Sequence, residues 1–178
     1  YIVRQMKALI ITSQLVQDHE FIYPFYRLKE EGLIVDVYNQ TNQIVKGFFG
    51  TKIPPQKDDN IVTLENLIID EYDLLVLPGG VKSMEILRLD EKAIKIVNKF
   101  NEKNKLIAAI CSGTMMLISA DIIKGKNVTG YYAWKQDIIN AGGNFIDSPC
   151  VEDNNIITSP HYKYCLLYTS PSPRDFEA

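Results

Sequence analysis

One short stretch near the middle of the chain constrains the fold more than any other. Residues 106–110 form an apolar run, Leu-Ile-Ala-Ala-Ile, which is short enough for a buried parallel strand. Cys111 follows at once, and Ser112-Gly113 leads into residues 114–121, which we expect to be helical. In a nucleophile elbow the reactive side chain stands on a tight strand-to-helix turn, and a small residue two positions later lets the helix pack closely. The pattern predicts Cys111 as a candidate nucleophile, although a cysteine in such a place is also often a small buried apolar residue.

Strand-like and helix-like segments alternate along the rest of the chain. The expected strands are residues 7–12, 33–38, 73–77, 127–130, 144–147 and 155–158, the last two lying around a turn at residues 152–154. The expected helices are residues 18–31, 90–104 and 134–141, and the turn-rich region 39–60 has room for a small hairpin. This alternation predicts an α/β fold with an open, doubly wound, mostly parallel sheet and helices on both faces, as in flavodoxin-like proteins.

Several polar residues and glycines follow the ends of the expected strands. Glu20 lies just beyond the first strand, Gly79-Gly80 follows the third, and Ser159-Pro160-His161 follows the last. Ligands of open α/β sheets bind beyond the carboxyl ends of the strands. We therefore expect these residues to converge with Cys111 on one site.

Composition and charge exclude several functional classes. The net charge of -3 and the pI near 5.4 argue against nucleic-acid binding, which needs a concentrated excess of Lys and Arg. No apolar run approaches the ~20 residues of a membrane span, and the N-terminus does not resemble a signal peptide. Three cysteines without a CxxC pair suit a reducing compartment, so we expect a cytoplasmic protein without membrane partners. No metal-ligand or nucleotide-binding spacing is found, and no cofactor is expected.

The sequence resembles the PfpI/DJ-1 superfamily, whose fold is like that of the class I glutamine amidotransferases. The matching segments are residues 6–12, 20–24, 26–32, 75–80 and 108–113. The resemblance implies that Cys111 is the family's reactive cysteine and that Glu20 hydrogen-bonds its sulfur. It further implies that Gly79, Gly80 and Ser112 are the candidate substrate- or oxyanion-binding residues.

Because an ionised carboxylate would raise the pKa of the thiol, we hypothesise that Glu20 is protonated and donates to a thiolate. Without the resemblance, Glu20 reads as an ordinary acid in the first turn of a helix.

The chain departs from the family pattern at several positions. Protease-like members carry histidine directly after the cysteine, whereas this chain has Ser112, so the protease interpretation loses its usual base. His161 stands where amidotransferases place a histidine after a late strand, but Lys163 occupies the place of the acid that follows. His161 is therefore a candidate either for accepting the proton of Cys111 or for lining the pocket.

The two ends of the chain are expected to differ from the rest. Residues 1–5 precede Met6 and read as an upstream extension, and residues 6–164 read as a single domain. Residues 165–178 resemble translated sequencing-adaptor sequence and are expected to be a non-native tail in place of the family's final helix.

The functional prediction is a cysteine-dependent hydrolase- or lyase-like enzyme that uses Cys111 with Glu20. Its expected partners are small-molecule or protein-adduct carbonyls, in a glyoxalase- or deglycase-like reaction, because Ser112 replaces the protease histidine. Two alternatives stay open. One is an intracellular peptidase or amidase, and the other is a redox sensor or chaperone whose Cys111 is oxidised to a sulfinate. The resemblance also implies a homodimer.

Overall fold

The computed structural model describes residues 4–54, 61–63 and 67–164. The tail at 165–178 and part of the extension at 1–5 lie outside the described residues, so both remain predictions. The strands are β1 Lys7–Ile11, β2 Ile34–Tyr38, β3 Val45–Lys46, β4 Lys52–Ile53, β5 Ile61–Val62, β6 Leu74–Leu77, β7 Leu106–Ile110, β8 Asn127–Val128, β9 Asn144–Phe145, β10 Val151–Asp153 and β11 Ile156–Ser159. The α-helices are α1 Asp18–Glu30, α2 Val81–Leu87, α3 Glu91–Glu102, α4 Thr114–Ser119 and α5 Lys135–Asn140. Short 3₁₀ turns cover Ile69–Glu71, Cys111–Gly113, Tyr132–Trp134 and Tyr162–Tyr164.

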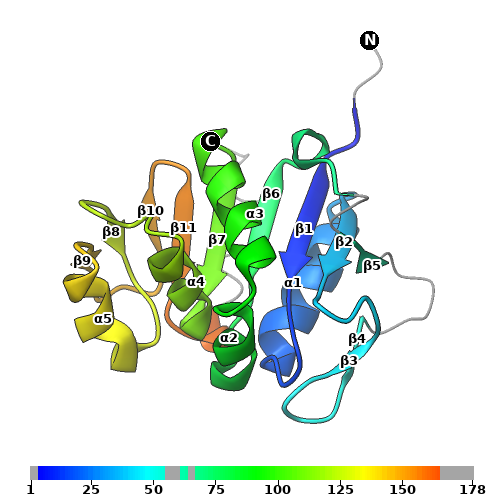
Figure 1. Cartoon of the computed structure of the whole chain (residues 1–178), viewed down its shortest axis with the longest axis horizontal. Coiled ribbons are helices and arrows are strands. Elements are labelled where there is room, and N and C mark those ends of the chain that lie inside the picture. The colour runs from blue at the N-terminus through cyan, green and yellow to red at the C-terminus, as the bar shows by residue number, and fades with distance from the viewer. Residues whose placement is uncertain (1–3, 55–60, 64–66, 165–178) are drawn as a thin grey trace, which may run out of the picture.

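Strand order in the main sheet determines where a ligand can bind. Within the described residues the sheet has seven strands in the order β10-β11-β7-β6-β1-β2-β5 (Figure 1). Its neighbours are parallel except for the antiparallel pair β10 and β11. The chain passes outward from β1 to β2 and then returns to the other side of β1 at β6, so the strand order reverses between β1 and β6. In open α/β sheets this reversal opens a crevice beyond the carboxyl ends of the strands. The predicted fold class is confirmed.

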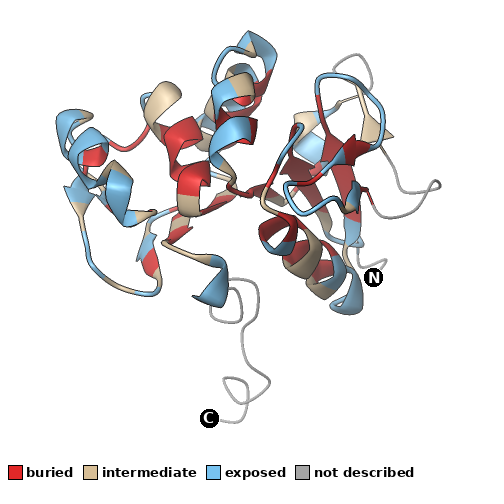
Figure 2. Ribbon diagram, turned by 90° about the horizontal axis from the view of Figure 1, so that it is seen from below, coloured by how far each residue is buried: buried red, intermediate tan, exposed pale blue. Residues whose placement is uncertain are grey.

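Helices cover both faces of the sheet because successive residues of a strand point to opposite sides. One apolar cluster joins the sheet to α1 and includes Ala8, Ile10, Phe21, Phe25, Val76 and Ala108. The other lies toward α3 and α4 and includes Leu9, Leu75, Val97, Phe100, Ile107 and Met116. Figure 2 shows these buried residues along the sheet and on the sides of the helices that face it. Complete burial of one of the larger of these side chains, such as Leu, Ile or Phe, contributes about 1.5 to 3 kcal/mol relative to leaving it in water.

The last third of the chain corrects one expectation. Residues 144–147 were expected to pair with the final strand around the turn at 152–154. Instead β10, which the sequence did not predict, forms that antiparallel pair with β11. Strand β9 pairs in parallel with β8 in a separate small sheet. Strand β10 could not be predicted because it has three residues, two of them acidic, whereas residues 144–147 contain the adjacent apolar pair Phe145-Ile146.

Two small elements flank the crevice. The hairpin expected within residues 39–60 is present as the antiparallel pair β3 and β4. Helix α2 was not predicted, because it has seven residues and begins after Gly80 without a side-chain cap. In the part of the chain that the structure describes, none of the helices is long and apolar enough to cross a membrane.

Candidate active site

The predicted elbow is present at the end of β7. Cys111 begins the 3₁₀ turn Cys111–Gly113 with φ +54°, a left-handed value that residues other than Gly, Asn and Asp rarely adopt. A Cβ atom on Gly113 would lie 2.1 Å from the carbonyl oxygen of Leu77 in the neighbouring strand β6. Only glycine therefore lets the turn pack against β6, and this packing fixes Cys111 at the carboxyl end of the sheet.

Glu20 reaches the same place from the first turn of α1. The Gln17 side chain caps this helix by accepting the backbone N–H of Glu20 at 2.9 Å. The Glu20 side chain is fully buried, and its Oε2 accepts the backbone N–H of Gly79 at 2.9 Å. A Cβ atom at position 79 would lie 2.3 Å from that oxygen, so glycine is required there. Burial disfavours the ionised carboxyl and raises the pKa of Glu20 to about 7, despite the opposing hydrogen bond from Gly79.

Glu20 and Cys111 form an interacting acid pair. Glu20 Oε1 is buried without a hydrogen-bond partner of normal geometry among the described residues. Burial, and then the charge of Glu20, raise the pKa of Cys111 to about 12, although the N–H and hydroxyl of Ser112 act to lower it. The two acids therefore favour states in which only one of them is ionised. A proton held on Glu20 removes the repulsion that opposes a thiolate.

The thiol opens into a small apolar pocket of about 280 Å³. Its lining comes from the loop after β1, the β3–β4 hairpin, α2, the elbow and the segment before α5: Leu15, Gln17, Phe48, Gly80, Val81, Lys82, Cys111, Ser112 and Tyr131. Of the residues expected from the sequence, Cys111, Gly80 and Ser112 line this pocket, while Glu20 and Gly79 lie buried behind the sulfur. The volume lies just below the usual range of about 300 to 1,000 Å³ for small-molecule pockets.

Trp134 is a site residue whose role the sequence did not reveal. Its indole Nε1–H donates to Ser112 Oγ at 3.1 Å, and the same Oγ lies 3.9 Å from Cys111 Sγ. The Ser112 side chain is buried. An aromatic wall at residues 131–134 could be suspected from composition, but a bond between positions 22 residues apart leaves no local signal.

Asp18 holds the outer wall of the pocket. Its buried carboxylate accepts the backbone N–H groups of Phe49 at 2.7 Å and Thr51 at 3.0 Å. Burial raises the pKa of Asp18, but the donors of Phe49 and Thr51 outweigh it and hold that pKa below its ordinary value. These bonds attach the hairpin to the first turn of α1 and place the exposed Phe48 beside the thiol.

His161 lies outside the ring of residues that lines the thiol pocket. Its ring contacts Tyr162, with 4.1 Å between centroids, and its Nδ1 accepts the backbone N–H of Lys163 at 3.3 Å. Burial, and then the charge of Lys163, lower the pKa of His161, which favours the neutral ring. Within the described residues no hydrogen bond joins His161 to Cys111, and a catalytic role for His161 remains a prediction.

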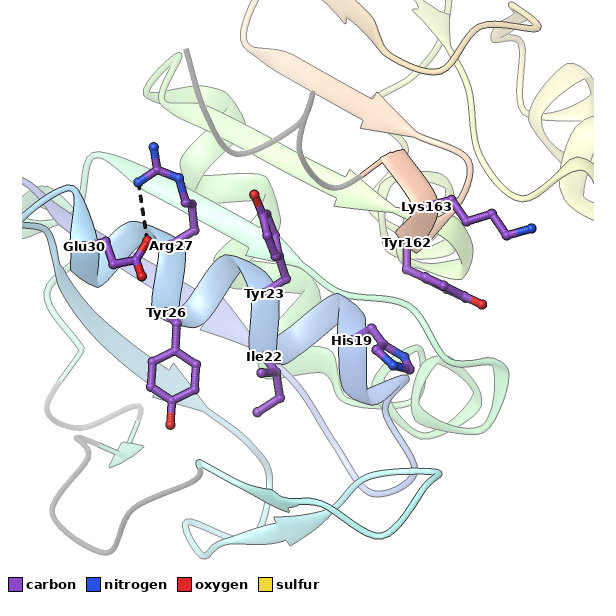
Figure 3. A pocket seen from close by; sticks show the side chains of 8 residues that line it. All are labelled: His19, Ile22, Tyr23, Tyr26, Arg27, Glu30, Tyr162 and Lys163. Atoms are coloured by element: carbon purple, nitrogen blue, oxygen red, sulfur yellow. Dashed lines mark ion pairs between the residues drawn. The ribbon is translucent and has the colours of Figure 1, made fainter. Parts of the chain in front are cut away.

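A second hollow, of about 500 Å³, runs along the outer side of α1 (Figure 3). Tyr23 and Tyr26 line it from the helix, and Tyr162 closes one end, stacked on His19 with 5.0 Å between ring centroids. Among the described residues, the two hollows share no lining residue. Tyr162, which lines the α1 hollow, nevertheless has its backbone N–H near the Glu20 carboxyl, where it lowers the pKa of Glu20.

Comparisons with known proteins agree with this geometry. The model of the DJ-1/PfpI family matches residues 6–170. Deglycase PfpI of Pyrococcus furiosus is 40% identical over 156 residues, which cover 88% of this chain and 90% of that protein. A deglycase of Pyrococcus horikoshii is 39% identical over 154 residues, covering 86% of this chain and 89% of its own length. The crystal structure of DJ-1beta from Drosophila melanogaster has a TM-score of 0.83 and 25% identity, over 93% of this chain and 87% of that one.

Proposed function

The chain belongs to the DJ-1/PfpI family, and we propose that it is a cysteine-dependent enzyme acting on reactive carbonyl compounds, either free or attached to proteins. The observation that carries the proposal is the buried Glu20 carboxyl behind the Cys111 thiol, at the floor of a small apolar pocket. Two similar proteins named as deglycases support the same reaction class.

The first step would be addition of the sulfur to an aldehyde. A bond forms between Cys111 Sγ and the aldehyde carbon, and the electrons of the carbonyl π bond move to its oxygen. Gly80 and Ser112 line the pocket beside the sulfur, and their N–H groups are the candidate donors to that oxyanion. Gly79 is a poorer candidate than the sequence indicated, because its N–H is bound to Glu20.

Glu20 would move the proton. With a pKa of about 7, the carboxyl can both donate and accept a proton near neutral pH. It would protonate the oxyanion to complete a hemithioacetal and, as a carboxylate, remove the hydrogen from the former aldehyde carbon. For methylglyoxal, that proton returns to the adjacent carbon and the hydroxyl proton passes to the neighbouring oxygen, which gives the thioester of lactate. Water then cleaves the S–C bond, releasing lactate and restoring the Cys111 thiol.

A peptidase reaction is less well supported by the same residues. It requires a group that protonates a leaving amine beside the nucleophile, and the residue there is Ser112, whose hydroxyl does not release its proton near neutral pH. The carbonyl reaction needs only the pair of Cys111 and Glu20.

The test is turnover of methylglyoxal by the full chain, followed as lactate formed. Wild type and Cys150→Ser, which alters a cysteine outside the pocket, should form lactate at similar rates. Cys111→Ser should form none, and Glu20→Gln should lose at least a hundredfold in rate, a typical contribution of general acid–base catalysis. Lactate formation by Cys111→Ser would refute the nucleophile assignment. No turnover by wild type, together with rapid oxidation of Cys111 by mild peroxide, would favour the redox-sensor alternative.

A further inference from the structure

The hydrogen bonds around Ser112 have a defined direction. An indole N–H can only donate, so Ser112 Oγ is the acceptor in its 3.1 Å bond with Trp134. The hydrogen of the hydroxyl must then point to another acceptor. Within the described residues, the only other partner of this buried oxygen is Cys111 Sγ, at 3.9 Å. A thiolate has no hydrogen to donate, so when Cys111 is ionised the Ser112 hydroxyl is the donor in this contact. The donors then run from Trp134 through Ser112 to the sulfur.

We propose that Trp134 is a positioning residue that fixes the Ser112 hydroxyl as a hydrogen-bond donor to the Cys111 thiolate. This rests on the proposed role of Cys111 as the reactive group. A donor aimed at sulfur stabilises the thiolate relative to the thiol, and a donor that itself accepts a hydrogen bond is strengthened by polarisation. The hydroxyl thus stabilises the sulfur anion without acting as a base.

Backbone hydrogen bonds and apolar packing hold Trp134 in place. Trp134 lies at the end of the 3₁₀ turn Tyr132–Trp134, where its backbone N–H donates to the carbonyl of Tyr131 at 2.9 Å. The backbone N–H of Tyr131 in turn donates to the carbonyl of Cys111 at 3.3 Å. Trp134 also packs against the apolar cluster on the α3 side of the sheet. The indole is therefore held by backbone bonds that begin at the nucleophile itself.

Other groups that influence the thiol come from different elements. Glu20 approaches from α1, Lys82 lines the pocket from α2 and is paired with Glu85, and Tyr131 lines it from the segment before the 3₁₀ turn. A test of the donor chain must leave these groups unchanged. Substitutions at Ser112 and Trp134 alone meet this condition.

The experiment measures the rate of Cys111 alkylation by iodoacetamide against pH, with the modified cysteine identified by peptide mass spectrometry. Because only the thiolate reacts, the midpoint of the profile reports the pKa of Cys111. Ser112→Ala should lower the rate at neutral pH about tenfold, since it removes a hydrogen bond to a charged group. Trp134→Phe, which keeps the ring and loses the N–H, should lower it about threefold, because the hydroxyl loses its polarising donor. Tyr26→Phe, which removes the hydroxyl of an exposed residue of α1 outside the thiol pocket, is the matched control and should leave the profile unchanged.

A double-mutant cycle decides whether Trp134 acts through Ser112. In the Ser112→Ala background, Trp134→Phe should have no further effect on the profile. An unchanged profile in Trp134→Phe alone, or an equal effect with and without the hydroxyl, would overturn the proposal. If Trp134→Phe does not fold, the Ser112→Ala profile decides, and a pKa of Cys111 equal to that of wild type overturns the proposal.

Alkylation does not depend on carbonyl turnover. Inactivity toward methylglyoxal together with shifted alkylation profiles would therefore refute the proposed function without contradicting the role of Trp134.

Discussion

Replacing Glu20 with glutamine should change how the stability of the fold depends on pH. The pKa of this carboxyl is about 7 in the folded protein against an ordinary value of 4.5. Because the folded pKa is raised, the contribution of Glu20 to stability is fully present below about pH 4.5 and is lost as pH rises toward 7. The difference, 7 − 4.5, corresponds to about 3 kcal/mol in total, of which about 2 to 3 kcal/mol is lost between pH 5 and pH 8. An amide can accept the Gly79 N–H through its oxygen and cannot ionise, so Glu20→Gln should not show this loss.

The assay is urea unfolding of wild type and Glu20→Gln at pH 5 and pH 8. Between these pH values the free energy of unfolding of wild type should fall by about 2 to 3 kcal/mol more than that of the variant, because other titrating groups contribute equally to both. For a chain of this size the same difference in thermal melts is about 4 to 12 °C in Tm. Glu102→Gln, at an exposed carboxyl in the last turn of α3, is the matched control. Parallel pH dependences for wild type and Glu20→Gln, agreeing within about 0.5 kcal/mol, would refute the reasoning that burial keeps Glu20 protonated.

Two further predictions concern the scaffold. Gly113→Ala should lower the free energy of unfolding by about 2 kcal/mol or more, because its Cβ would lie 2.1 Å from the carbonyl oxygen of Leu77. Gly32→Ala, with open space around it, should cost only the backbone strain of about 1 kcal/mol. Equal losses for the two variants in urea unfolding would contradict this. Asp18→Ala should destabilise the protein by about 1 to 2 kcal/mol at pH 7, because it leaves two part-buried N–H groups without their charged acceptor. Since the folded pKa of Asp18 is depressed, its stabilisation is present above its ordinary pKa of 3.8 and is lost as pH falls below it. A loss as large at pH 2 as at pH 7 would argue against the carboxylate as the cause.

The part of the fold built from long apolar runs could be predicted from the sequence. Strands β1, β6 and β7 are buried on both faces and read as continuous apolar segments, and α3 has a clear apolar stripe with Asp90 as its cap. Short elements could not be predicted in the same way. Strand β10 has only three residues and contacts β8 as well as β11, and helix α2 contacts α4, so both depend on neighbours that no local pattern records.

The same distinction applies to the site. The convergence of Cys111, Glu20 and Gly80 follows from their places after parallel strands, because these strand ends meet at one edge of the sheet. The bond between Trp134 and Ser112 depends on the direction in which a separate turn presents its side chain. That direction is set by packing, and it becomes visible only in three dimensions.

The left-handed backbone of Cys111 limits which residues could replace it during divergence of the family. A φ of +54° is tolerated by glycine and asparagine and at moderate cost by small unbranched side chains, but it is strongly disfavoured for valine, isoleucine and threonine. A homologue that has lost the activity can therefore keep this turn only if position 111 is occupied by one of a small set of residues. Threonine is therefore strongly disfavoured as an alternative nucleophile at this position, whereas serine can adopt the required backbone conformation.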